Sequence, residues 1–315
     1  MRIRVFVALG CALGTLSPAA HATMLGPATG YDAFVFGSGD FQANNSQANG
    51  NLAAGGDVTL MNYAVAANIP GDSTQTPNPA RLVVGGNLTA TNGGVGLGQN
   101  GAIYVGGTTS LTGFTATGGI FAQNLVDFAA AQTLYDSLSA TWADLTPNGT
   151  VTTGSTLTLT GTSPTLNVFS VAGSSIGTSL AINAPAGSTV LINVTGPSVT
   201  FMNGGVSLTG VSSADVMYNL VSATSLTLDN MNPDGSILAA FAATTAGTGA
   251  LDGQLITMAY GGMNGNQFGE TAFNDVLFQG TLPAVPLPGS AWLLAGGLLA
   301  LAGLLRASRH AARLA

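Results

Sequence analysis

The sequence predicts an all-β protein built as a parallel β-helix, or β-solenoid, with one amphipathic α-helix along its side. Three observations favour this fold class: glycine pairs that precede threonine-rich segments, a long series of short alternating segments, and a single stretch with helical spacing. A β-sandwich also has short strands between turn residues, and it stays open as the alternative. The repeated glycine pairs favour the solenoid, whose coils place small residues and Asn at their corners.

The glycine pairs recur in the segments AAGGDVTLMNYAV, VVGGNLTATNGGV and YVGGTTSLTGFTA. They are Gly55-Gly56, Gly85-Gly86 and Gly106-Gly107. The composition of the intervening segment NIPGDSTQTPNPA predicts a loop. Glycine at a fixed place before a short strand predicts a tight corner, where the backbone needs either a positive φ or very close stacking.

The second half of the chain continues with short segments that alternate apolar and polar residues and stop at Gly, Asn, Asp or Pro. Examples are STLTLTG, TLNVFSVAG, TVLINVTG and SVTFMNGGVSLTG. We expect each to form one strand of a coil.

One segment has a different period. In NLVDFAAAQTLYDSLSATWADL, apolar residues recur every three or four positions, which predicts an amphipathic helix over about 124–145. Asn124 is the expected N-cap, and Pro147 follows the end of the helix. We expect the apolar stripe to pack along the β domain, with Trp142 in the core rather than on a sugar-binding surface. The stripe consists of Leu125, Phe128, Ala131, Tyr135, Leu138, Trp142 and Leu145.

The first 22 residues have the pattern of a secretory signal peptide. Arg2 and Arg4 precede an apolar stretch, and Ala20 and Ala22 supply the small residues before a cleavage site after Ala22. We therefore expect an exported protein.

The charged residues are distributed unevenly. All 13 acidic residues lie between Asp32 and Asp275, whereas Arg81 is the one basic residue in that region, so the middle of the chain carries a net charge of 1 − 13 = −12. This balance argues against nucleic acid or anionic lipid as a partner.

The middle of the chain also lacks His, Cys and Lys, since the two histidines and the single cysteine fall in the two end segments. Their absence excludes disulfides, histidine-based triads, Schiff bases and the usual zinc sites there. We expect no cofactor.

Several phrases of the middle resemble a known family: GGNLTATNGGV, the helical segment, GTSPTLNVFSVAG, LAINAPAGSTVLINVTG and NPDGSILA. They are similar to the choice-of-anchor A domain of bacterial surface proteins over roughly Ala33 to Gly280. The resemblance implies an adhesive domain, here residues 23–280, without catalytic residues.

The C-terminal segment, residues 281–315, resembles a PEP-CTERM sorting signal. Its motif is Val285-Pro286-Leu287-Pro288, with Leu287 where the family usually has Glu. An apolar stretch and a basic end with Arg306, Arg309 and Arg313 follow, which fits a minimal transmembrane helix with its tail in the cytoplasm. The resemblance implies processing by an exosortase. A permanent membrane anchor is the alternative.

Carboxylates are the remaining candidates for chemistry. Asp229 and Asp234 lie in LDNMNPDGS, and Asp252 lies in LDGQ. The first interpretation is a turn, the second a calcium site, and the third a pair of catalytic carboxylates. Arg81 precedes a predicted strand and is interpreted as a surface charge.

Taken together, the sequence predicts a non-enzymatic protein of the cell envelope or extracellular matrix, with exopolysaccharide or another surface component as its partner. Two alternatives stay open: a polysaccharide-active enzyme that uses an Asp pair, and a calcium-stabilised glycan-binding module on the same scaffold.

Overall fold

The computed structural model describes residues 25–69, 79–97, 100–176, 179–202, 204–230, 232–262 and 269–285. Both predicted end segments fall beyond these ranges, apart from residues 281–285 of the tail. The predicted functional residues outside the described part are Ala20, Ala22, Pro286, Leu287, Pro288, Arg306, Arg309 and Arg313.

Short strands make up most of the chain, as the alternating segments predict. The strands of the first half are β1 (Tyr31–Val35), β2 (Phe41–Asn44), β3 (Asn51–Ala54), β4 (Val58–Val65), β5 (Ala80–Val84), β6 (Leu88–Val95), β7 (Ala102–Val105), β8 (Thr109–Ala116) and β9 (Ile120–Ala122). Helix α1 (Phe128–Ala143) follows. The strands of the second half are β10 (Thr150–Thr152), β11 (Leu157–Thr160), β12 (Leu166–Ala172), β13 (Ser179–Asn183), β14 (Thr189–Thr195), β15 (Ser198–Met202), β16 (Gly205–Thr209), β17 (Val216–Leu220), β18 (Ser225–Asp229), β19 (Ser236–Ala246), β20 (Ala250–Leu251), β21 (Leu255–Gly262) and β22 (Ala272–Phe273). Three 3-10 turns are η1 (Gly26–Ala28), η2 (Gly173–Ser175) and η3 (Ser213–Asp215).

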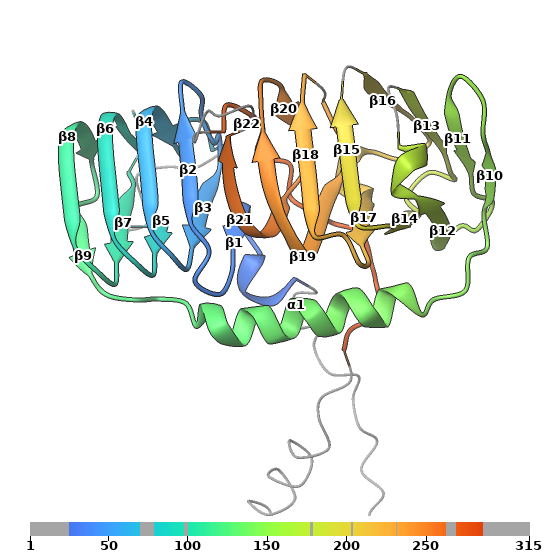
Figure 1. Cartoon of the computed structure of the whole chain (residues 1–315), viewed down its shortest axis with the longest axis horizontal. Helices are drawn as coiled ribbons and strands as arrows, with labels where there is room; N and C mark the ends of the chain where they lie inside the picture. Colours follow the sequence, from blue (N-terminus) through green and yellow to red (C-terminus); the bar gives the residue numbers. More distant parts are fainter. Residues whose placement is uncertain are drawn as a thin grey trace, which may run out of the picture.

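The strands stack into a parallel solenoid, which confirms the predicted fold class and excludes the sandwich (Figure 1). Its helix-side face runs in the order β12-β14-β17-β19-β21-β1-β3-β5-β7-β9. A second face, here called the threonine face, consists of β15, β18, the last residues of β19 and β21, and then β2, β4, β6 and β8. A third face contains β11, β13 and β16 and the short pair β20–β22. Their inward side chains form one continuous apolar core.

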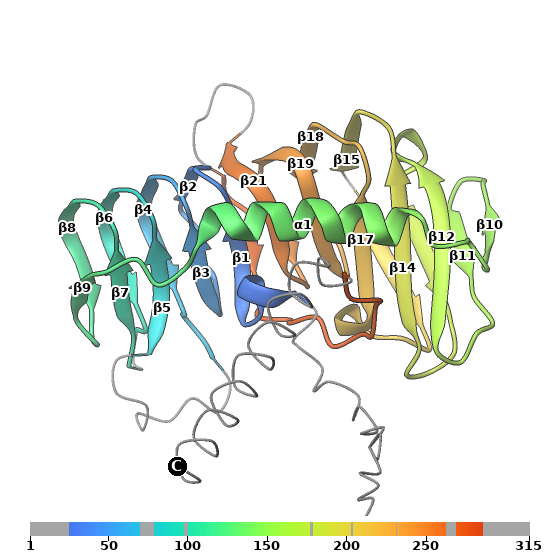
Figure 2. The ribbon, with the colours of Figure 1, turned by 90° about the horizontal axis from the view of Figure 1, so that it is seen from below.

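The chain begins in the middle of the solenoid and not at an end. β1 pairs in parallel with β3 on one side and with β21 on the other, so Ala33 lies between Leu52 and Leu255. The coils of the first half stack outward to β8 and β9. The connection after β9 and then α1 carry the chain back along the solenoid to its opposite end (Figure 2). The coils of the second half stack from β12 back towards the middle, where β21 pairs with β1. β1 and β21 therefore meet in a central seam.

The glycine pairs form tight corners through close stacking. A Cβ atom on Gly85 would collide with the carbonyl oxygen of Gly55, and one on Gly106 with that of Gly85. Neither Gly85 nor Gly106 has a positive φ, so close stacking is the alternative that these corners use. Successive corners contact each other directly, and only the absence of a side chain allows this approach.

The predicted helix is confirmed, but its start is four residues later than expected. Asp127, and not Asn124, is the N-cap: its carboxylate accepts a hydrogen bond from the Ala130 N–H at 2.9 Å. Asn124 instead accepts from the Val126 N–H at 3.2 Å in the connection that precedes the helix. Leu125 therefore lies outside the helix and is 42% exposed.

The apolar stripe of α1 packs on the helix-side face. Phe128, Ala131, Tyr135, Leu138 and Trp142 are all buried in a second core, which confirms Trp142 as a core residue. Buried polar contacts also fix the position of the helix on the sheet. Ser139 Oγ donates to Asn219 Oδ1 at 2.7 Å, Asn219 Nδ2 donates to Asn193 Oδ1 at 2.8 Å, and Asn193 Nδ2 donates to the Trp142 carbonyl at 2.8 Å.

The helix also holds both ends of the described chain. Tyr135 donates its hydroxyl proton to the Leu25 carbonyl at 2.9 Å and accepts from the Ala28 N–H at 2.8 Å. Trp142 donates its indole N–H to the Pro283 carbonyl at 2.9 Å, and Leu282 is only 4% exposed. Residues 281–285 therefore pack against the β domain.

Two carboxyl groups face each other at the seam. Asp32 is fully buried at the irregularity between β1 and β3, and its Oδ2 accepts from the Gly50 N–H at 2.7 Å. Its Oδ1 and the Oδ1 of Asp275 both flank the bare Cα of Gly50. Burial, followed by the neighbouring Asp275 carboxylate, raises the pKa of Asp32 to about 8. Two carboxylates this close are most stable when they share a proton.

Arg81 is not the surface charge that the sequence suggests. It lies within β5, is partly buried, and donates from Nη1 to Asn51 Oδ1 at 3.2 Å. Its charge favours the ionised form of Asp275 and so lowers the pKa of that carboxyl, although burial raises it more. The one cation of the middle region therefore helps to balance the buried acidic pair.

The acidic pair predicts a pH dependence of stability. Asp32 has a raised folded-state pKa, so the folded state binds more protons than the unfolded state between about pH 4 and pH 8. Stability should fall as pH rises through this window, by up to about 1.4 kcal/mol per pH unit from this one group. The other groups that face it, Asp275, Arg81 and the Tyr63 phenol, set the exact midpoint.

The measurement is the free energy of unfolding in urea from pH 4 to pH 9. In Asp32→Asn, an amide can still accept from Gly50 and can donate to Asp275, so we expect a flatter profile and higher stability than wild type above pH 8. Asp144→Asn, an exposed carboxyl at the end of α1, serves as the matched control. An unchanged slope in Asp32→Asn would contradict the shared proton.

Candidate binding surface

The most regular surface feature is a column of partly or fully exposed residues, nearly all polar, along the threonine face. Strand register places Thr200 beside Thr227 and Thr227 beside Thr245. Beyond the seam, Gln42 lies beside Thr59, Thr59 beside Thr89, and Thr89 beside Ser110. Gly261 of β21 lies beside Thr245 and joins the two halves. The column crosses eight strands and consists of Thr200, Thr227, Thr245, Gly261, Gln42, Thr59, Thr89 and Ser110.

The alternation of each strand produces this column. In β4, Val58 and Leu60 point into the core, so Thr59 between them must point outward. The same reasoning applies to β18, where Leu226 and Leu228 are buried on either side of Thr227. Neighbouring strands lie about 4.8 Å apart, so the outward groups repeat at that spacing along the solenoid.

Asparagine side chains form a ladder at one edge of this face. Asn45, Asn62 and Asn92 each have a positive φ near 50°, a conformation that Asn tolerates better than most residues. Asn62 Nδ2 donates to Asn45 Oδ1 at 3.0 Å, and Asn92 Nδ2 donates to Asn62 Oδ1 at 3.2 Å. The ladder turns β4 and β6 sharply, so that their last residues join the third face.

A second ladder follows the glycine pairs at the opposite edge. Asp40 Oδ1 accepts from the Asp57 N–H at 2.8 Å, Asp57 Oδ1 accepts from the Asn87 N–H at 2.7 Å, and Asn87 Oδ1 accepts from the Thr108 N–H at 2.9 Å. Each side chain satisfies the backbone of the next coil. The two ladders hold β2, β4, β6 and β8 in register, so the hydroxyl groups of this half of the face form a rigid array of hydrogen-bonding groups.

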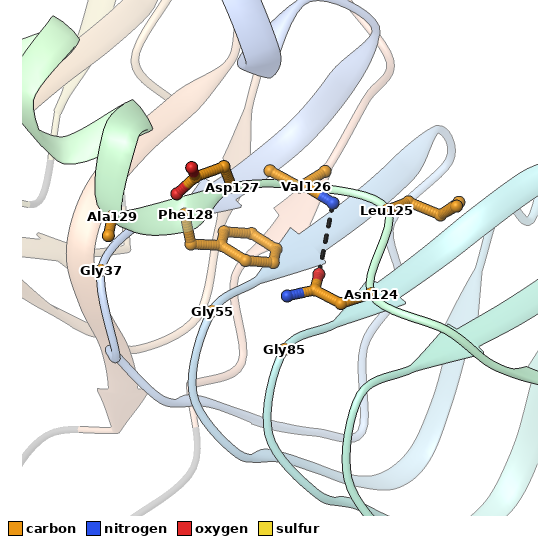
Figure 3. Close-up of a pocket in the computed structure, with 9 residues that line it drawn as sticks. All are labelled: Gly37, Gly55, Gly85, Asn124, Leu125, Val126, Asp127, Phe128 and Ala129. Atoms are coloured by element: carbon orange, nitrogen blue, oxygen red, sulfur yellow. Dashed lines mark hydrogen bonds between the residues drawn. The ribbon is translucent and has the colours of Figure 1, made fainter.

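A separate hollow of about 460 Å³ lies where the chain enters α1. Figure 3 shows Gly37, Gly55 and Gly85 on one side and residues 124–129 on the other. The hollow exists because the stacked glycines have no side chains, and Phe128 packs over Gly55. Asp127 is the one ionisable group among the residues that line it, and its carboxylate already caps the helix. The hollow therefore has no pair of acid and base groups for catalysis.

The structure brings together two of the three candidate carboxylates. Asp234 and Asp252 lie side by side in neighbouring coils and line a cavity of about 470 Å³ together with Asn230 and Asn232. Burial and the charge of Asp252 raise the pKa of Asp234 to about 6. Asp252 accepts a hydrogen bond from Asn274 Nδ2. Asp229 ends β18 beside Met202 and is not among the residues that line this cavity.

The pair supplies two carboxylates to this cavity. Within the described ranges, no group of three or more His, Cys, Asp or Glu side chains is placed to hold a metal ion. Asn232 is already engaged, since its Oδ1 accepts from the Ala250 N–H at 3.1 Å.

Sequence reasoning found the strands that carry the threonine column but not the column itself. Its register joins β2, which precedes α1, to β21, which follows it, and no local pattern predicts that pairing. The Asn-rich corners were visible as turn residues in the sequence, although their hydrogen bonding from coil to coil was not.

The family model described as "Putative Ice-binding-like adhesive domain" matches residues 24–269 of the chain. The chain belongs to this family. The match covers the whole threonine face and both halves of the solenoid, so the membership applies to the domain that carries the candidate surface.

Among solved structures, the fold is similar to a crystal structure of an ice-binding protein from an Antarctic bacterium of the Flavobacteriaceae. The alignment covers 81% of this chain and 82% of that chain, at 12% sequence identity and a TM-score of 0.33. No curated protein sequence matches the chain. Within the part of the chain that the structure describes, no helix is long and apolar enough to cross a membrane.

We expect the Asp234–Asp252 pair to act as a turn element and not as a calcium site. The melting temperature should then be unchanged by EDTA or by 5 mM calcium, a concentration on the order of that which weak extracellular calcium modules require. Asp234→Asn should raise stability at pH 8 by at most about 1 kcal/mol, because solvent screens the repulsion that it removes. Asp229→Asn is the matched control. A melting temperature that rises with calcium in wild type, but not in Asp234→Asn, would restore the calcium interpretation.

Proposed function

We propose that this protein is a non-enzymatic adhesive component of the cell surface or extracellular matrix, and that the threonine face is its contact surface. The observation that carries the proposal is the column over eight strands, in which six residues carry a hydroxyl group and Gly261 and Gln42 lie at the seam. Family membership supports the adhesive role.

Many weak hydrogen bonds can add up to firm binding on such a surface. A single exposed hydroxyl contributes little to binding, since each hydrogen bond to a ligand replaces one to water. A rigid array loses little conformational entropy on binding, so the small gains add together when the ligand is itself flat or repetitive. Exopolysaccharide of the cell's own matrix has this character, and it is the partner that we propose.

The direction in which the chain leaves the solenoid agrees with this role. Both described ends contact α1, through Tyr135 and Trp142, on the helix-side face. An attachment at the C-terminus would therefore leave the threonine face accessible.

We further propose that the chain is a choice-of-anchor A protein whose tail, residues 281–315, is a PEP-CTERM sorting signal. In this proposal the leader is removed after Ala22. An exosortase-type enzyme then recognises Val285-Pro286-Leu287-Pro288, while Arg306, Arg309 and Arg313 keep the end of the tail in the cytoplasm. The sequence motifs support it.

Binding to isolated exopolysaccharide tests the role of the face. We expect the triple variant Thr59→Val, Thr89→Val, Thr245→Val to bind at least about tenfold more weakly, because it removes hydroxyl groups while it keeps side-chain shape; tenfold corresponds to about 1.4 kcal/mol. The measurement is depletion of protein from solution by the immobilised polysaccharide.

The control variant, Thr160→Val with Thr209→Val, removes hydroxyls from exposed strand positions on the third face. Equal loss of binding in both variants, or release of reducing sugar by the wild type, would refute adhesion through the threonine face.

The intact mass of the protein from the surface and medium of its host tests the sorting proposal. We expect a chain that begins at Thr23 and lacks the residues after about Pro288. A mass that runs to Ala315 would instead establish a permanent anchor.

A further inference from the structure

The two ends of the solenoid are built differently. At the end of the second half, the chain covers the outer edge of β12. Asn148 Oδ1 accepts from the Val168 N–H at 2.7 Å, and Asn148 donates from Nδ2 to the Leu166 carbonyl at 3.0 Å. The β10 strand also closes the third face there by pairing antiparallel with β11. At the opposite end, β8 pairs only with β6 and β9 only with β7, within the described residues (Figure 1).

The outer edge of β8 presents backbone groups that have no partner in the described structure. The Leu88 N–H donates to the Thr108 carbonyl, so Thr108 is directed towards β6. Alternate residues of a strand bond to opposite sides. Thr109 and Leu111 therefore direct their N–H and C=O groups away from the solenoid, where another strand can pair with them.

This edge lacks the features that normally prevent pairing between molecules. Edge strands are usually protected by charged side chains, by proline or by a covering segment. From Tyr104 to Val126, which includes all of β8 and β9, the sequence contains no charged residue and no proline. Ile120 of β9 is 46% exposed, and Leu111 of β8 is only partly covered by the core.

The distribution of charge indicates that the partner is a second copy of this chain. The middle of the chain has a net charge of −12, so two copies repel each other over most of their surfaces. The uncharged end coil is where two copies can approach without that repulsion. Head-to-tail stacking is blocked because the other end is covered by Asn148 and closed by β10.

We propose that two copies of this protein associate end to end, with β8 of one copy pairing antiparallel with β8 of the other about a two-fold axis. With the axis perpendicular to the threonine face, the two threonine faces lie in one plane and the two β8 strands run antiparallel. The interface is closed, because each copy uses the same patch. The pairing buries Leu111 and Ile120 and joins the two hydroxyl columns through Ser110.

The proposed dimer depends on the β8 edge and does not require the adhesive role. If adhesion also holds, the dimer presents a threonine face of twice the length to one ligand, and the second contact becomes intramolecular. Failure of the dimer would leave the binding experiment on single copies unaffected.

The test is the mass of the full chain in solution by light scattering over a range of concentrations. We expect a dimer in the wild type. Thr112→Lys places a positive charge on an outward side chain of β8, so the two copies present like charges to each other, and the dissociation constant should rise at least about tenfold. Thr160→Lys, at an exposed position of β11, is the matched control and should stay dimeric.

A second variant distinguishes loss of pairing between copies from misfolding of one copy. Thr109→Pro removes only the N–H that faces outward, so β8 should keep its bonds to β6 while it loses pairing with the other copy. Both β8 variants should associate more weakly than wild type, and at concentrations where the wild type is itself monomeric they should share its melting temperature.

Cysteine cross-linking locates the interface. In a Cys11→Ser background, Ser110→Cys should form an intermolecular disulfide, whereas Thr160→Cys should not. A wild-type monomer at all concentrations, a dimer that survives both β8 variants, or equal cross-linking at the two positions would overturn the proposal.

Discussion

The parallel pairing of β1 with both β3 and β21 is the interaction on which the whole molecule depends. It joins two half-solenoids that the chain builds in opposite directions, and it makes their apolar interiors one core. The stacked rings of Phe41 and Tyr260, with centroids 4.5 Å apart, continue the same junction on the threonine face. Because these contacts link residues more than two hundred positions apart, neither half reaches its full burial until the chain is nearly complete.

Local features of the sequence predicted the coils well, because the physics of a coil is local. Alternation determines which side chains enter the core, and glycine pairs mark corners that tolerate no Cβ atom. The helix was also predictable from its spacing. Its start was misplaced because Asn124 and Asp127 are both capping residues, and only the path of the chain over Gly55 and Gly85 decides between them.

The central seam could not be predicted in the same way. Nothing near Asp32 indicates that it will face Asp275, and nothing near Arg81 indicates that it will contact Asn51. These groups depend on a pairing that only the complete fold creates. The threonine column has the same origin: each Thr was visible in its own strand, but their alignment across the seam follows from the order of strands in space.

The attachment of both described ends to α1 has a mechanical consequence. Tyr135 and Trp142 are seven residues apart, about 10 Å along a helix, so both described ends lie close together on the helix-side face. The C-terminal one lies at β14, where the Thr281 N–H donates to Thr189 Oγ1. A load applied at the C-terminus would enter on the side of a rigid bar, nearer the β12 end, with an arm of coils on each side. Torques from ligands on the two arms would then partly cancel at the attachment point, and a pull on the ligand would reach the tether mainly as tension.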